Sequence, residues 1–502
     1  MKKDDIETLK GRLKEVSHLG AALSLLGWDQ EVNMPPKAAD LRAASIAQLS
    51  AIVHNKFLAV DEDGLLARLN AALRSKKLKG PDAVIVAETW RVYEREKKLP
   101  ESFIREMSET TSKAQGVWAQ ARAENDFKLF LPWLAKIVKL KRKEAEYVGY
   151  EESPYDALLD TFEPGMTARE ASRILNDLKD FLIPFIRKIR SSKAAIDADR
   201  AKGKFPLAAQ AEFNRMLAEA IGFDFEAGRM DKSTHPFTSG AHPYDVRLTT
   251  RYREDDVYHA IGSTIHETGH GLYEQGLPAE HFGTPLAEAV SLGIHESQSR
   301  MWENLIGKGM PFWKHFYPKL QKEFPVPFKK LPLADFYRIL NRVEPSLVRT
   351  EADEVTYNLH IIIRFEIEKE MVEGTIDLAD LPKIWKAKMK EYLGIDVPND
   401  ALGVLQDVHW SFGGIGYFPT YSFGNLYSAQ FYAAMGKDIP NLSAKIARGE
   451  FKEINSWLRT HIHSRGKTYK AGELVKKVTG EGLNSQYFTK YVEKKYGDIY
   501  SA

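Results

Sequence analysis

Residues 263–276 read STIHETGHGLYEQG and contain the pattern H-E-x-x-H, with His266 and His270 at its ends and Glu267 after the first histidine. In a helix, residues four apart lie on the same face, so both imidazoles can reach a single metal ion. Glu267 can then lie beside an open coordination position, where it can take a proton from a bound water. The stretch therefore predicts a metal-binding helix with a base beside the metal.

The flanking sequence supports a helix at this position. Acidic residues at 254–256 suit a helix start, apolar residues recur at near-helical spacing from Val257 to Leu272, and Gly276 and Pro278 can end the helix. Two histidines and a glutamate in this order are typical of zinc peptidases. The alternative is a surface helix that carries two histidines by chance.

The composition indicates an ordinary globular protein. The 502 residues are 43% hydrophobic and 28% charged with a formal net charge of +2, which favours neither nucleic-acid nor membrane partners. Cysteine is absent, so a transition-metal site must use His, Asp and Glu. The charged N-terminus lacks the apolar core of a signal peptide, and no apolar run reaches bilayer length. We therefore expect a cytoplasmic protein.

Most of the chain has helical patterns. Residues 1–75, 81–146 and 166–191 read as helices, and the prolines are scattered without a low-complexity linker. We therefore expect one unit over 1–502, a large helical body whose catalytic region spans 235–425.

The pattern changes just before the metal-binding helix. Residues 244–251 read YDVRLTTR, which alternates and is rich in β-branched side chains, and His235-Pro236-Phe237 precedes them. A short strand or hairpin fits this pattern. An edge strand here can bind the backbone of a peptide substrate. The alternative is a structural hairpin that covers the core.

A third metal ligand is needed besides the two histidines. The H-x-x-G-x-x-H continuation of the metzincins is absent, so a carboxylate from the next helix, expected over 285–305, is the usual alternative. Spacing does not choose among its three candidates. They are Glu288, Glu296 and Glu303.

Two later segments carry further polar groups. A long helix is expected from Pro345 to Glu373, and Arg349 near its start can pair with a protein carboxylate or grip a substrate carboxylate. In the glycine-rich loop expected over 403–425, an imidazole or phenol can stabilise a developing oxyanion. An aromatic-glycine loop also serves simple packing. The loop's candidates are His409, Tyr417 and Tyr421.

These segments together resemble the M32 family of metallocarboxypeptidases, the thermostable carboxypeptidase Taq type. Six motifs occur in the family's order over most of the chain, and Val348 stands where the family often has Ile. The motifs are His235-Pro236-Phe237, Asp245-Val246-Arg247-Leu248-Thr249, His266-Glu267-Thr268-Gly269-His270, His295-Glu296-Ser297-Gln298, Val348-Arg349-Thr350-Glu351-Ala352-Asp353 and Gly403-Val404-Leu405-Gln406-Asp407-Val408-His409-Trp410.

The resemblance implies a mainly helical fold with a deep central groove and a small β-sheet near the active site, similar to neurolysin and angiotensin-converting enzyme, and usually a homodimer. It implies Glu296 as the third zinc ligand, Arg349 as the receptor of the substrate's terminal carboxylate and Tyr421 as the catalytic tyrosine. Cobalt is expected to substitute for zinc.

We add four residues and one segment to these expectations. His409 is a candidate second oxyanion donor, and His235, Arg247 and Tyr417 are candidate substrate contacts. The helices of 1–75 are expected to cover the groove.

The functional hypothesis is a zinc-dependent carboxypeptidase that releases single amino acids from peptide C-termini, with a free C-terminus as the recognised group. The first alternative is an endo-acting or dipeptidyl-type oligopeptidase of similar fold. The second is a helical binding scaffold with a structural zinc, although such a site normally has four protein ligands and often cysteine.

Overall fold

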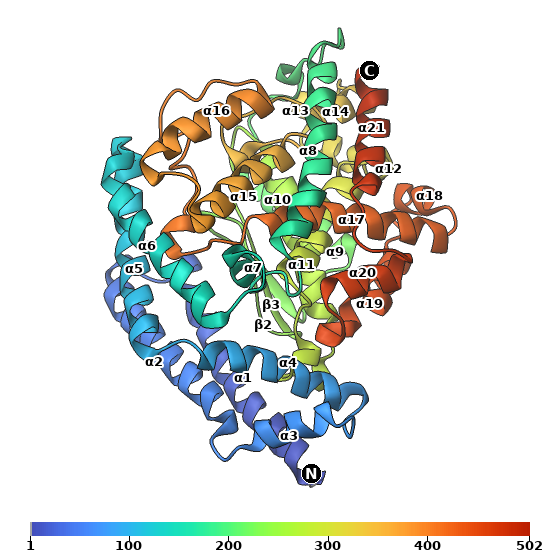
Figure 1. The fold of residues 1–502 in the computed structure, drawn as a ribbon. Coiled ribbons are helices and arrows are strands. Elements are labelled where there is room, and N and C mark those ends of the chain that lie inside the picture. Colours follow the sequence, from blue (N-terminus) through green and yellow to red (C-terminus); the bar gives the residue numbers. More distant parts are fainter. Residues whose placement is uncertain (1–2, 502) are drawn as a thin grey trace.

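The computed structural model describes residues 3–501, which fold into a mainly helical body with one small sheet (Figure 1). Its helices follow one another along most of the chain, as the sequence predicts. They are α1 Lys3–Val32, α2 Ala39–Leu58, α3 Leu65–Arg74, α4 Gly80–Lys97, α5 Glu101–Glu124, α6 Phe127–Val148, α7 Pro154–Leu159, α8 Ala168–Arg190, α9 Leu207–Ile221, α10 Val257–Gly276, α11 Leu292–Arg300, α12 Met310–Glu323, α13 Pro325–Phe328, α14 Leu333–Leu340, α15 Tyr357–Glu373, α16 Leu381–Leu393, α17 Pro419–Asp438, α18 Leu442–Ala447, α19 Lys452–His461, α20 Ala471–Thr479 and α21 Gln486–Tyr500. Among residues 3–501, no helix is both long and apolar enough to span a bilayer.

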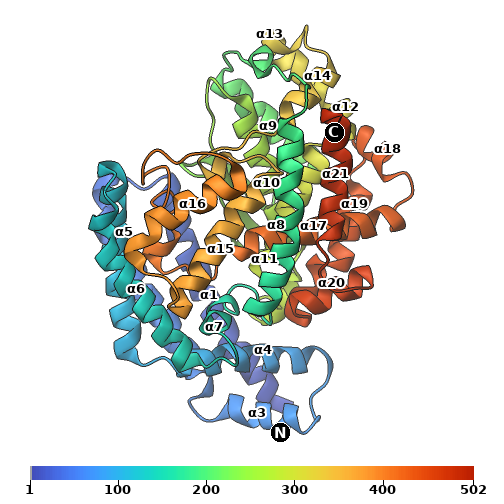
Figure 2. The same ribbon diagram turned by 45° about the horizontal axis from the view of Figure 1, so that its top comes forward.

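The first four helices have a hydrophobic core of their own. Leu9, Leu66, Leu69 and Val86 are fully buried in this small core, to which the distant Leu286 also contributes. Helices α3 and α4 lie at the lower end of the molecule in both views (Figures 1 and 2). The N-terminal helices therefore pack as a unit beside the main core, and this unit extends beyond residue 75.

The sheet has three strands in the order β1-β3-β2, with β1 Gly228–Lys232, β2 Thr238–His242 and β3 Asp245–Thr250. Strands β2 and β3 form the predicted antiparallel hairpin, whereas β1 pairs with β3 in parallel and was not predicted, since GRMDK shows no apolar alternation. Strand β2 lies at the edge of the sheet and contacts both α1 and α10.

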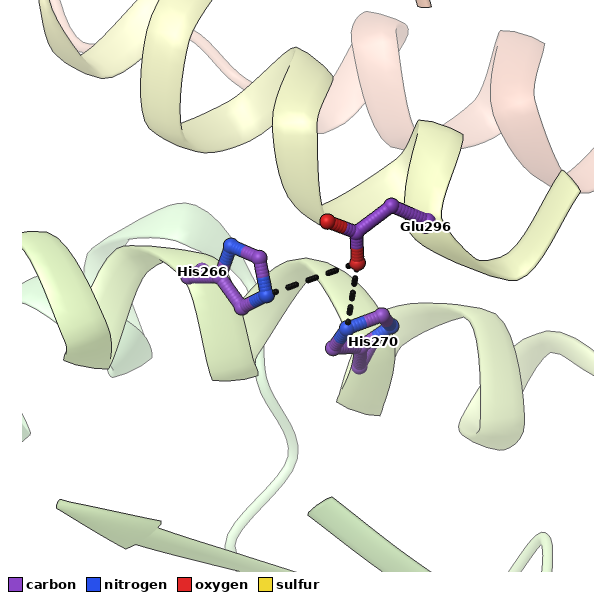
Figure 3. A group of neighbouring side chains, drawn as sticks. All are labelled: His266, His270 and Glu296. Carbon is purple, nitrogen blue, oxygen red and sulfur yellow. Dashed lines mark ion pairs between the residues drawn. The ribbon is translucent and has the colours of Figure 1, made fainter. Parts of the chain in front are cut away.

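Helix α10 carries the H-E-x-x-H pattern and has the predicted bounds. The Asp256 side chain accepts hydrogen bonds from the backbone N–H groups of Tyr258 (3.0 Å) and His259 (3.1 Å), which caps the helix. Val257, Ile261 and Ile265 bury one face of the helix in the main core. The face that carries the histidines turns toward α11 (Figure 3).

Close packing of α10, α11 and α17 depends on two glycines. A Cβ at Gly269 of α10 would lie 2.6 Å from the carbonyl oxygen of Gln298 and 2.6 Å from the Cα of Ser299, both in α11. A Cβ at Gly424 of α17 would lie 2.4 Å from the Cγ of Glu296. Only glycine allows the three helix backbones to approach this closely.

Two predicted helices are interrupted. The prediction of a continuous helix from Pro345 to Glu373 is wrong. Only a 3-10 turn, Arg349–Glu351, precedes α15, which begins at Tyr357. The Asp353 carboxylate accepts from the backbone N–H groups of Val355 (2.9 Å) and Thr356 (3.0 Å), so the main helix begins after it. The helix expected over 285–305 is likewise divided.

That second segment has three parts. A 3-10 turn at Pro285–Ala287 comes first, and the side chain of Ser291 then caps α11 by accepting from the backbone N–H of Ile294 at 3.0 Å. A π-helix, Met301–Gly307, continues directly from α11. π-helical turns are rare in proteins overall, but those that occur often lie at functional sites.

Candidate metal centre

The two histidines of α10 and Glu296 of α11 converge on one point (Figure 3). The Nε2 atom of His266 lies 3.6 Å from a carboxylate oxygen of Glu296, and the Nε2 atom of His270 lies 3.4 Å from the same oxygen. One ligand atom from each residue lies within 4.8 Å of the others. Two imidazoles and one carboxylate form a donor set that suits a divalent transition metal and leaves a fourth position open.

The outer nitrogen of His266 has a carboxylate partner. Its Nδ1 lies 2.8 Å from Glu303, which the π-helix carries, and Arg300 donates from Nη1 to the same carboxylate oxygen at 3.2 Å. Arg300 also donates from Nε to Glu296 at 2.6 Å. Burial alone would lower the pKa of His266, but the carboxylates of Glu296 and Glu303 outweigh it and raise that pKa.

The outer nitrogen of His270 is bonded through a second histidine. Its Nδ1 lies 2.5 Å from Nδ1 of His295, whose Nε2 lies 2.7 Å from Glu274. In the tautomer in which Nε2–H of His295 donates to the Glu274 carboxylate, Nδ1 of His295 can accept from Nδ1–H of His270. The Nε2 lone pair of His270 then faces Glu296. In both histidines the outer contact therefore orients the inner nitrogen as metal ligands require.

Glu267 lies beside the triad and is held by the sheet. The hydroxyl of Thr238, the first residue of β2, donates to the Glu267 carboxylate at 2.7 Å. Burial raises the pKa of Glu267 above its usual value, although His266 and the Thr238 hydrogen bond oppose that shift. A carboxylate with a raised pKa is suited to accept a proton from water and to return it.

The other two candidate carboxylates lie elsewhere. Glu288 pairs with Lys467 at the surface, and Glu303 contacts the outer nitrogen of His266 instead of the point where the inner nitrogens meet. Among residues 3–501, one cluster of side chains is arranged to hold a metal ion, and it consists of His266, His270 and Glu296.

Arg349 is buried and shares a carboxylate with a second arginine. Its Nε donates to Asp407 at 3.0 Å and its Nη1 donates to the hydroxyl of Tyr357 at 3.1 Å. Arg364, which is fully buried, also pairs with Asp407, at 2.5 Å. The ion pair expected for a structural arginine therefore exists, but two guanidinium groups around one carboxylate leave a net positive charge. Such a charge suits a bound carboxylate.

The three aromatic candidates of 403–425 lie together. Nε2 of His409 lies 3.3 Å from the hydroxyl of Tyr421, and the rings of Tyr417 and Tyr421 are 5.3 Å apart. The guanidinium of Arg349 lies 4.9 Å from the centre of the Tyr421 ring. Burial lowers the pKa of His409 to about 3, so this imidazole is neutral. Tyr421 stands in the first turn of α17, and the expected loop therefore ends before it.

His235 and Arg247 lie on the sheet side of the site. His235 is exposed in the turn before β2, whereas Arg247 of β3 donates from Nε to Asp245 at 2.9 Å and covers the Trp28 ring of α1 at 4.3 Å. These contacts connect Arg247 to the N-terminal helices. A substrate contact for either residue stays a prediction.

Several partners in this site were not predicted as such. Thr238 contacts Glu267, Glu274 contacts His295, and Asp407 contacts Arg349. Glu303 contacts the outer nitrogen of His266. Glu274 lies four residues after His270, a spacing that the sequence did display. The other pairs join distant segments, so no local pattern marks them.

A buried carboxylate holds two points of the loop that carries His409. Glu368 of α15 accepts from the indole of Trp410 at 2.9 Å, from the hydroxyl of Tyr155 at 2.8 Å and from the backbone N–H of Gly416 at 3.0 Å. Burial raises the pKa of Glu368 from 4.5 to about 7. Between pH 4.5 and about 7, Glu368 therefore keeps its proton in the folded protein, whereas in the unfolded chain this carboxyl has released it.

Glu368→Gln is therefore expected to flatten the pH dependence of stability. In the wild type, this proton makes the free energy of unfolding fall as the pH rises from 4.5 through about 7, by roughly 3 kcal/mol from this group. Urea unfolding at pH 5 and pH 8 measures the difference for both proteins. Equal changes in wild type and variant would contradict the assignment.

Comparison with known proteins agrees with this geometry. The family model described as carboxypeptidase Taq (M32) metallopeptidase matches residues 8–496. The chain is 40% identical to carboxypeptidase 1 of Bacillus subtilis over 97% of both chains, and 41% identical to thermostable carboxypeptidase 1 of Pyrococcus furiosus over 98% of both. The crystal structure of the M32 carboxypeptidase from Deinococcus radiodurans superposes with a TM-score of 0.96 at 36% identity over 100% of both chains.

The family assignment covers nearly the whole chain and confirms the fold class expected from the sequence, a mainly helical protein with a small sheet. The family model matches residues 8–496, and curated relatives at about 40% identity cover 97% of the chain. The chain therefore belongs to the carboxypeptidase Taq (M32) family of metallopeptidases, and it is a metal-dependent carboxypeptidase.

Proposed function

We propose that the enzyme is a zinc-dependent carboxypeptidase that releases single amino acids from peptide C-termini. The observation that carries this proposal is the convergence of His266, His270 and Glu296 beside the buried carboxylate of Glu267. A set of two imidazoles and one carboxylate is the usual donor set of a catalytic zinc, and cobalt accepts the same ligands. The metal content of the purified protein, measured by mass spectrometry, tests the identity of the ion.

The residues around the triad have distinct roles in hydrolysis. When bound, the divalent ion would polarise the scissile carbonyl and make water more acidic. Glu267 takes the proton from the attacking water and returns it to the leaving amine. The hydroxyl of Tyr421 donates to the developing oxyanion, with His409 as a second donor. Loss of one such donor typically costs about 2.7 to 4 kcal/mol of transition-state stabilisation.

Arg349 supports exopeptidase action rather than endopeptidase action. Its buried guanidinium, and the positive charge that it shares with Arg364, are suited to grip the terminal carboxylate of a peptide. Arg349 also stacks on Tyr421 and contacts Tyr357, whose ring lies 4.4 Å from the guanidinium of Arg300, the partner of Glu296. The terminal carboxylate would therefore be held close to the site of cleavage.

Peptides with an amidated C-terminus are expected to be cleaved at least about a hundredfold more slowly than the free acids, because the amide leaves the buried charge unpaired. Arg349→Ala should bring the free acid down to the rate of the amide. The fold should persist in this variant, since Arg364 still neutralises Asp407. Product masses from paired acid and amide peptides measure both effects.

Equal cleavage of the two peptides would instead favour an endo-acting oligopeptidase. Release of dipeptides, visible in the same mass spectra, would indicate dipeptidyl activity. Metal binding without any hydrolysis of either peptide would contradict the roles proposed for Glu267 and Tyr421.

We also propose that a deep groove lies at the metal centre and that the N-terminal helices cover it. We further propose a cytoplasmic location and a homodimer.

Helix α2 supports a dimer, because no residue of this largely apolar helix is buried and the side chains of Leu41 and Ile52 are 73% and 44% exposed. Such an apolar surface is typical of protein interfaces. Sedimentation equilibrium measures the oligomeric state, and a monomer at all concentrations would contradict the proposal.

A further inference from the structure

A buried carboxylate that hydrolysis does not use lies between two helices of the metal centre. Glu163, in the loop between α7 and α8, is 1% exposed. One of its oxygens accepts from the backbone N–H of Gly293 in α11 at 3.1 Å. The other oxygen accepts from the hydroxyl of Tyr427 in α17 at 2.9 Å. One side chain therefore connects α11 directly to α17.

The loop around Glu163 is itself held in place. The backbone N–H of Glu163 donates to the carbonyl of Leu159 at 2.9 Å, and the Asp160 carboxylate accepts from the backbone N–H of Gly165 at 2.8 Å. The carbonyl of Phe162 accepts from the backbone N–H of Leu292 at 3.0 Å, a second contact with the start of α11. Glu163 is thus presented from a rigid turn and can transmit position to both helices.

The contacts beyond Glu163 follow a regular order. Three residues after Gly293 in α11 is Glu296, and three residues before Tyr427 in α17 is Gly424, onto which the Glu296 side chain packs. One helical turn forward along α11 therefore corresponds to one turn backward along α17, so the two helices run antiparallel. The next turn backward along α17 reaches Tyr421.

We propose that Glu163 is a positioning residue that sets the register of α11 against α17, and thereby the distance from Tyr421 to the carboxylate of Glu296. This inference rests on the proposed roles of Glu296 as metal ligand and Tyr421 as oxyanion donor. A slip of one helix along the other would separate these two groups without changing either side chain. Since Glu163 touches neither metal nor substrate, its effect would pass through the helices.

Burial is consistent with a positioning role. It raises the pKa of Glu163 to about 7, while hydrogen bonds from three neutral donors, on Ser291, Tyr427 and Gly293, oppose the shift. Near neutral pH the carboxyl is therefore often protonated. Glutamine reproduces the shape and neutrality of that form, whereas alanine removes the connection.

The test compares Glu163→Ala, Glu163→Gln and Tyr427→Phe. The alanine variant is expected to lower kcat about tenfold and to weaken metal binding about tenfold in chelator competition. The glutamine variant should restore both values to within about threefold, and Tyr427→Phe should lie between them. The matched control is Tyr496→Phe, which removes an equally buried tyrosine hydroxyl from the carboxylate of Glu354, 2.8 Å away. It should lower stability with kcat and metal affinity unchanged.

A double-mutant cycle separates register from general damage. In a Tyr421→Phe background, Glu163→Ala should lower kcat by less than about threefold, because the group that it positions is already absent. Additive effects, or a Glu163→Ala variant that differs from wild type in stability alone, would overturn the inference. If Tyr421→Phe itself matches wild type, the proposed role of Tyr421 fails. The metal affinity of Glu163→Ala then tests the inference by itself: an unchanged affinity would overturn the positioning role of Glu163. If Glu163→Ala does not fold, kcat and metal affinity are compared between Tyr427→Phe and the control Tyr496→Phe. Equal values in these two variants would overturn the inference.

Discussion

Glu267→Gln is expected to keep its metal and to lose about a thousandfold or more in kcat. Glutamine has the size of glutamate and can still accept the hydrogen bond from Thr238, so the geometry of α10 against β2 should persist. The amide cannot take a proton from water or return it to the leaving amine. Amino-acid release from a free-acid peptide measures the rate, and elemental mass spectrometry measures the metal.

Thr238→Val provides a graded comparison, because it removes the hydrogen bond to the Glu267 carboxylate and leaves that group in place. Hydrogen bonds to charged groups contribute about 1.5 to 3 kcal/mol, so a fall in kcat of about tenfold to a hundredfold is expected. An active Glu267→Gln enzyme with full metal content would remove the proposed mechanism.

Gly269→Ala is expected to weaken metal binding by about a hundredfold or more. The added methyl group would lie 2.6 Å from backbone atoms of α11, which cannot move aside as a flexible side chain would. Helix α10 must therefore shift, and His266 and His270 move away from Glu296. Changes to the groups that merely support metal ligands typically lower metal affinity by about 10- to 100-fold, and here the ligand side chains themselves would move. Chelator competition measures the affinity, and urea unfolding measures the accompanying loss of stability.

The same helix supplies the control. Gly262 also lies in α10, but a Cβ built there has no neighbouring atom within 4 Å. Gly262→Ala should therefore leave metal affinity unchanged and stabilise the protein by about 0.5 to 1 kcal/mol through helix propensity. Wild-type metal affinity in Gly269→Ala would show that α10 and α11 can separate without loss of the site.

The sequence was informative where function depends on local spacing. The four-residue interval between His266 and His270 predicted a shared helix face, and the acidic residues before Val257 predicted where that helix begins. Alternating residues around Arg247 predicted the hairpin. These features depend on helix and strand periodicity, which a single segment displays in full.

Prediction from local patterns failed in two situations. In one, a side chain hydrogen-bonds to the backbone and ends a helix; in the other, side chains from distant segments come into contact. The capping carboxylate of Asp353 interrupts a segment that otherwise reads as helix. From the residues alone, Glu288, Glu296 and Glu303 were equivalent, because only the packing of α11 between α10 and α17 decides which carboxylate meets the histidines. The family resemblance supplied the choice of Glu296, whose carboxylate lies near the inner nitrogens of His266 and His270.

The π-helix after α11 makes this segment sensitive to a change in its length. A π-helical turn, with its i→i+5 hydrogen bonds, contains an extra residue relative to an α-helical turn. Deletion of one residue within Met301–Gly307 would rotate the following side chains by about 100°. Glu303 would then turn away from His266 if the deletion preceded it, while His266, His270 and Glu296 stayed in place. Such a deletion would therefore remove the outer contact of His266 and spare the point where the inner nitrogens meet Glu296, so a weakened rather than an abolished metal site is expected.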